Sequence, residues 1–157
     1  MVGLITKTLI SLSLLCLSWL ALAGKGGLEV RNSKIFLPLP GSHMTAGYAH
    51  IENRSAKAIK VSVRNVDHFA KVELHRSFEN KGRARMEKVD EVVIESGQAL
   101  DLMPGGYHLM LFHPQGNLKT GQTANVHLLV DGEPAVFEFK FESRVDQRKE
   151  DDHHQHH

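Results

Sequence analysis

Four residues in the middle of the chain combine two imidazoles with two thioethers at defined spacings. Ten residues separate His75 from Met86, twenty-one separate Met86 from His108, and one separates His108 from Met110. Thioether sulfur and imidazole nitrogen suit soft metals, whereas magnesium and calcium prefer oxygen and zinc gains little from methionine. The four residues therefore predict a site for cuprous copper, Cu(I).

The N-terminal residues 1–23 predict export. They carry one charge, at Lys7, followed by a long apolar run that ends in Ala-Leu-Ala at residue 23, a pattern typical of a secretory signal peptide cleaved after Ala23. An uncleaved anchor is the alternative, because the run is nearly long enough to span a bilayer. A lipoprotein site at Cys16 is disfavoured, since the bulky Leu15 precedes it.

Composition restricts the remaining chain to a few classes of protein. Cys16 is the only cysteine, so the exported chain would fold around an ordinary core without a disulfide. Loss of Lys7 changes 19 basic and 18 acidic residues to 18 of each, so we expect no nucleic-acid partner. We also expect no membrane insertion after signal removal. We expect one β domain at 24–143 and a disordered, polar tail at 144–157.

The apolar residues alternate in short runs that turn residues interrupt, which predicts an all-β fold. Such strands at this spacing are typical of a single-domain β-sandwich or small Greek-key barrel. The predicted strands are Gly47–Asn53, Ile59–Val66, Ala70–Phe78, Arg85–Ile94, Tyr107–Phe112, Asn125–Val130 and Ala135–Glu142.

These strands would bring the four residues together. A hairpin turning near Gly82 would place His75 close to Met86. His108 and Met110 are two residues apart on one strand and so share a face. We therefore expect four neutral ligands at one end of a barrel.

The other histidines and methionines have less support as ligands, because no spacing connects them. Met103 is expected to be packing, since methionine commonly fills core space. The weaker metal candidates are His43, Met44 and His50, and the histidines expected to be structural are His68, His113 and His127. In a regular strand His113 would face away from His108.

The complete motif resembles the PCu(A)C-type periplasmic copper chaperones. That family has the same His, Met and His-x-Met spacing, and the flanking segments Val72–His75 and Leu102–Leu111 are also similar. The resemblance implies a cupredoxin-like barrel in the periplasm that binds Cu(I) at the four residues. It also implies delivery of copper to the CuA centre of cytochrome c oxidase. We expect a monomer, with the CuA subunit or another copper chaperone as the copper acceptor. The chain departs from the family at Arg76 and at residues 113–115.

Three classes of function remain as alternatives to a carrier that releases copper by ligand exchange. A blue-copper electron-transfer protein needs a cysteine thiolate, which the exported chain lacks. An enzyme is not expected, because no nucleophile and base pair stands out. A metal-buffering or zinc-scavenging module would act through the tail and would leave the central motif unexplained.

The tail supplies a second candidate metal site, for Cu(II). Four histidines end the chain, and imidazole suits Cu(II), Ni(II) and Zn(II). Gln155 and the charged residues before the histidines favour a native extension over an expression tag. The candidate tail ligands are His153, His154, His156 and His157.

Overall fold

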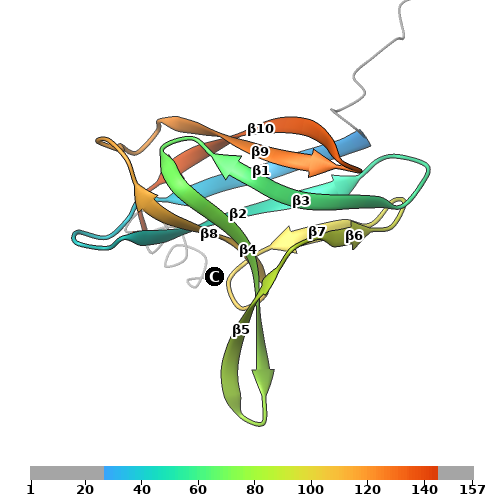
Figure 1. Ribbon diagram of the computed structural model, residues 1–157, viewed down its shortest axis with the longest axis horizontal. Helices are drawn as coiled ribbons and strands as arrows, with labels where there is room; N and C mark the ends of the chain where they lie inside the picture. Colours follow the sequence, from blue (N-terminus) through green and yellow to red (C-terminus); the bar gives the residue numbers. More distant parts are fainter. Residues whose placement is uncertain (1–26, 145–157) are drawn as a thin grey trace, which may run out of the picture.

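The computed structural model describes residues 27–144 and is built almost entirely from β-strands (Figure 1). The all-β prediction is confirmed. The strands are β1 (Leu28–Phe36), β2 (Met44–Asn53), β3 (Ile59–Val66), β4 (Phe69–Asn80), β5 (Arg83–Val89), β6 (Val92–Ile94), β7 (Ala99–Leu102), β8 (Tyr107–Pro114), β9 (Thr123–Val130) and β10 (Glu133–Glu142).

All ten strands belong to one open sheet, in the order β5-β4-β8-β7-β2-β1-β10-β9-β3-β6. Two pairings, β1 with β10 and β7 with β8, are parallel, and the others are antiparallel. β2 pairs first with β8 and then with β7. The sheet folds over on itself, so that its two halves enclose the core (Figure 1).

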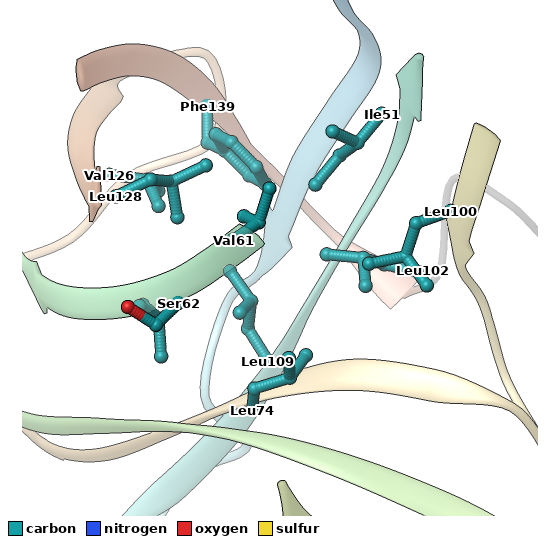
Figure 2. A pocket seen from close by; sticks show the side chains of 11 residues that line it. Ile51, Val61, Ser62, Leu74, Leu100, Leu102, Leu109, Val126, Leu128 and Phe139 are labelled. Carbon is teal, nitrogen blue, oxygen red and sulfur yellow. The ribbon is translucent and has the colours of Figure 1, made fainter. Parts of the chain in front are cut away.

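The core draws alternate residues from both halves of the sheet. Leu109 and Leu111 of β8 are buried together with Val126 of β9 and with Phe139 and Phe141 of β10. Figure 2 shows the apolar pocket between the two halves, whose cavity volume is about 10 Å³. A cavity of this size holds at most one water molecule, so the core offers no room for an organic ligand.

The structure contains strands that the sequence pattern does not reveal. β1 was not predicted, because a register shift between Arg31 and Lys34 and a positive φ of 51° at Asn32 interrupt its alternation. β7 has only four residues and also escaped prediction. The prediction of a single strand at Arg85–Ile94 is wrong. β5 ends at Val89, and after Asp90 and Glu91 the chain forms β6 at the opposite end of the sheet.

The predicted hairpin between β4 and β5 is confirmed. Its two-residue turn, Lys81 and Gly82, has positive φ at both positions (52° and 72°), as the right-handed twist of a tight hairpin requires. The distal part of β4 and the whole of β5 project away from the body of the domain (Figure 1). The hairpin therefore forms an arm, defined here as residues 75–89.

Several sequence predictions concern residues outside the described range. These are the signal peptide 1–23 with cleavage after Ala23, Cys16, and the tail ligands His153, His154, His156 and His157. At the end of the described chain, the guanidinium of Arg144 lies 5.1 Å from the ring centre of Phe36. Within residues 27–144, no helix has the length and apolar character needed to cross a bilayer.

Asp131 connects the β9–β10 turn to the start of β3. Its carboxylate accepts hydrogen bonds from Lys57 Nζ (2.8 Å) and from the backbone N–H of Lys60 (2.9 Å). The Lys57 hydrogen bond, followed by the Lys60 bond, holds the pKa of Asp131 below its ordinary value of 3.8. A lowered pKa stabilises the folded state above that ordinary value, and the contribution is lost as the pH falls below it.

We expect Asp131→Asn to be slightly less stable than the wild type at pH 7. The difference in unfolding free energy should shrink as the pH falls below 3.8, because the wild-type carboxylate is then protonated in the unfolded chain. Urea denaturation at a series of pH values from 7 to 2.5 measures this difference. A difference that stays constant across the series would contradict the assigned role.

Candidate metal centre

The four residues predicted from the sequence lie on three adjacent strands, β5, β4 and β8. His75 on β4 is directly opposite His108 on β8. Met110 is opposite Glu73, two residues from His75 on β4, and Met86 on β5 is opposite Ser77, two residues to the other side. His75 is therefore the central residue, with one methionine diagonal to it on each neighbouring strand.

The strand register places all four side chains on one face. Residues opposite each other on antiparallel strands share a face, and so do residues two apart on one strand. The intervening residues Leu74 and Leu109 point to the other face and are buried in the core. The four residues thus occupy the outer face of the sheet at the base of the arm.

The two imidazoles face each other at close range. Their ring centres are 6.0 Å apart, with an angle of 43° between the ring planes. His108 is only 5% exposed, and the side chain of His75 is 15% exposed. Both rings are thus largely protected from water at the surface of the sheet.

Hydrogen bonds define which nitrogen of each ring carries the proton. Nε2–H of His75 donates to the Glu73 carboxylate (2.8 Å), and Nδ1–H of His108 donates to the Gly106 carbonyl (3.1 Å). Since these partners only accept, the lone pairs are left on His75 Nδ1 and His108 Nε2. His75 Nδ1 is buried and lacks a hydrogen-bond partner among the described residues. A buried polar atom without a partner is costly and requires an explanation, of which a bound ion is one.

The thioethers differ in their access to solvent. Met86, on the outermost strand of the sheet, is 53% exposed, whereas Met110 is half-buried. Met103, which we expected to be packing, is also 53% exposed. Among residues 27–144, no three His, Cys, Asp or Glu side chains are gathered around a metal position. Sulfur would have to supply half of the ligands at this centre.

Comparison with known protein families shows which family this chain belongs to. The profile of the LpqE-like family, described as "Putative lipoprotein LpqE-like", matches residues 28–142, nearly all of the described domain. The chain belongs to the LpqE-like family. One curated relative, "Putative lipoprotein Lxx21020" from Leifsonia xyli subsp. xyli, is 29% identical over 106 residues. That alignment covers 67% of this chain and 64% of the relative, slightly less than two thirds of its length.

Several solved structures have the same fold as this LpqE-like domain. The apo PCuAC domain from PmoF1 has a TM-score of 0.62 at 21% identity, covering 75% of this chain and 95% of that domain. The copper-bound PCuAC domain from PmoF2 has a TM-score of 0.60 at 16% identity, and the match covers 75% of this chain and 94% of that domain. Apo-DR1885 from Deinococcus radiodurans has a TM-score of 0.59 at 21% identity, and the match covers 92% of this chain and 99% of that protein. The cupredoxin-like fold implied by the sequence resemblance is confirmed.

Glu73 is a residue of the candidate centre that sequence reasoning did not single out. Its carboxylate accepts hydrogen bonds from Lys71 (2.8 Å) and from His75 (2.8 Å), and these two partners, in that order, lower its pKa to about 2. Glu73 is therefore ionised near neutral pH and holds the His75 ring in one tautomer. The Glu-x-His spacing was the available signal, because residues two apart on a strand share a face.

The remaining histidines of the domain fall into three groups. His50 lies 2.6 Å from Asp101, and His127 lies 3.3 Å from Asp67, so both have carboxylate partners. His68 contacts the ring of Phe141. His43 and His113, by contrast, lie against each other.

Arg76 is a position at which the chain departs from the PCu(A)C-type family, and its side chain does not crowd the candidate metal centre. Arg76 alternates with His75 on β4 and lies beside aromatic rings, with its guanidinium 5.7 Å from the ring centre of Tyr107 and 5.9 Å from that of Phe78. Arginine favours such stacking on aromatic faces.

Proposed function

We propose that this LpqE-like domain carries copper outside the cytoplasm, binding Cu(I) through His75, His108, Met86 and Met110. The observation that carries the proposal is the buried lone pair of His75 Nδ1, directly across the strand pair from His108. We infer that His75 Nδ1, His108 Nε2 and the two thioether sulfurs are the donor atoms.

The chemistry of these donors suits a cargo that must be released. Cu(I) accepts thioether and imidazole ligands, and a methionine binds without losing a proton. In an oxidising compartment a thiolate site is open to disulfide formation, a reaction that a thioether does not undergo. Four neutral ligands leave the bound ion with its positive charge, which favours exchange to an anionic thiolate on a partner.

The unequal exposure of the ligands suggests an order of exchange. Met86 is the most accessible of the four and lies on the edge strand of the arm. We infer that an incoming thiolate or imidazole replaces Met86 first and the buried His108 last. The copper remains Cu(I) throughout, so no electron donor is needed.

One line supports export, and a second supports copper as the cargo. The family and its curated relative are described as lipoproteins, which is consistent with export and with the apolar segment at residues 1–23. The PmoF2 domain with the same fold is described as copper-bound. We propose a periplasmic carrier whose acceptor is the CuA subunit of cytochrome c oxidase or another copper chaperone.

A Cu(I) titration tests this function. The full chain, with His153, His154, His156 and His157 replaced by alanine, is titrated anaerobically against a chromophoric Cu(I) chelator. We expect one tightly held equivalent, which moves to an added apo CuA domain. If the substituted chain holds no Cu(I), the central site is not a copper site, and metal buffering by the tail becomes the function.

Glu73 should contribute to Cu(I) affinity without touching the ion. Outer-shell partners of metal-bound histidines typically contribute about 10–100-fold in affinity, so we expect a loss of that size for Glu73→Ala. Glu73→Gln keeps an oxygen that accepts the His75 proton and should retain most of the affinity. The same chelator competition measures both variants. Equal affinity in Glu73→Ala and the wild type would show that the carboxylate does not position His75.

A further inference from the structure

A second pair of histidines lies where β2 and β8 meet, beyond the four-residue centre. His43 immediately precedes β2, and His113 is the last residue but one of β8. The backbone N–H of His113 donates to the His43 carbonyl (2.7 Å), which holds the two residues side by side. Their ring centres are 6.3 Å apart, with 45° between the planes.

The backbone of His113 accounts for this arrangement. Its φ is 53°, in the left-handed region that few residues other than glycine adopt. A left-handed residue interrupts the regular alternation of β8. The prediction that His113 faces away from His108 assumed a regular strand and therefore does not apply.

Neither ring of this pair is engaged elsewhere in the described part of the chain. His43 and His113 are both exposed, and neither side chain has a hydrogen bond or an ion pair with residues 27–144. His50 and His127, also at the surface, instead have carboxylate partners. His43 and His113 therefore retain free nitrogen lone pairs when neutral.

The separation of the rings suits a shared metal ion. Two imidazole nitrogens at about 2.0–2.1 Å from one ion hold their ring centres roughly 5–6 Å apart, so a small rotation of exposed side chains suffices. His75 and His108, at 6.0 Å, have nearly the same spacing. Imidazole is a good ligand for Cu(II), Ni(II) and Zn(II), and water can fill the remaining positions.

We propose that His43 and His113 form a second metal site, which binds a divalent transition-metal ion such as Cu(II). The site is independent of the Cu(I) centre, because His113 lies three residues beyond Met110 on β8, about 10 Å along the strand. With two protein ligands it exchanges metal readily. Binding involves no electron transfer, and the ion stays divalent.

The test uses the full chain without its competing ligands. The four tail histidines are replaced by alanine, Met86 and Met110 by leucine, and His75 by glutamine, so that the Cu(I) centre keeps only one imidazole. Cu(II) is then titrated by calorimetry, and its nitrogen ligands are counted by electron paramagnetic resonance. We expect one equivalent with two imidazole nitrogens. His43→Ala and His113→Asn should each weaken binding at least about tenfold, as ligand loss exceeds the effect of losing an outer-shell partner.

Two features keep the test decisive. Asparagine tolerates the left-handed backbone, so His113→Asn preserves the local chain conformation. His127→Ala removes another surface histidine and should leave Cu(II) affinity unchanged. Equal Cu(II) affinity in His43→Ala, His113→Asn and the parent overturns the proposal. Full Cu(I) binding by His43→Ala and His113→Asn in a chain that retains His75, Met86 and Met110 would leave the carrier function untouched.

Discussion

Replacing Met86 and Met110 together with leucine is expected to lower Cu(I) affinity by about a hundredfold or more, because loss of ligands should exceed the 10–100-fold effect of losing an outer-shell partner. The two sulfurs lie on β5 and β8, on either side of the strand that carries His75. Their loss leaves two imidazoles, a set that binds Cu(II) or Zn(II) as readily as Cu(I). The variant should therefore lose selectivity for Cu(I) as well as affinity.

Leucine isolates the contribution of sulfur from that of packing. Methionine and leucine have similar volumes, and exchanging them usually costs less than about 1.5 kcal/mol even in a core. Met86 is half exposed, so the cost there is smaller still. Chelator competition measures the affinity, and thermal denaturation checks that the apo variant folds as the wild type does.

Met103 provides the matched control. It has the same exposed fraction as Met86, 53%, and lies on the loop that precedes β8. Met103→Leu should bind Cu(I) as the wild type does. If the double variant keeps its Cu(I) while Met103→Leu loses it, the ligand set is different from the one proposed.

The sequence predicts the local parts of the centre because they depend on neighbouring residues. The Lys81-Gly82 turn determines the β4–β5 hairpin, and the period of two in a strand puts His108 and Met110 on one face. The pairing of β4 with β8 is different. It sets His75 opposite His108, 33 positions later in the chain, and depends on which strands meet across the whole sheet.

The elements that the sequence did not predict have specific physical causes. β1 carries a left-handed residue, Asn32, and β7 is too short to show a period. The contact between His43 and His113 depends on one left-handed backbone angle, which no composition or spacing reveals. The burial of Asn53 was likewise not predicted, because Asn-Arg-Ser is typical of an exposed turn.

Replacing Asn53 with alanine should lower the unfolding free energy by about 1–3 kcal/mol, the cost of leaving one buried carbonyl, that of Ile94, without a donor. Asn53 is fully buried at the end of β2. Its Nδ2 donates to the carbonyls of Lys57 and Ile94 (2.8 Å each), and its Oδ1 accepts from the N–H and hydroxyl of Ser55. One side chain thus connects β2, the turn before β3, and β6.

Comparison with an exposed asparagine separates this effect from a general effect of the substitution. Asn80 lies at the tip of the arm, and Asn80→Ala should stay within about 0.5 kcal/mol of the wild type. Urea denaturation measures both. The folded fraction of Asn53→Ala should still bind Cu(I), because Asn53 lies six residues along β2 from the last residue that pairs with β8, about 20 Å from that pairing. A stability equal to that of Asn80→Ala would mean that the buried hydrogen bonds of Asn53 contribute no net stability to the sheet.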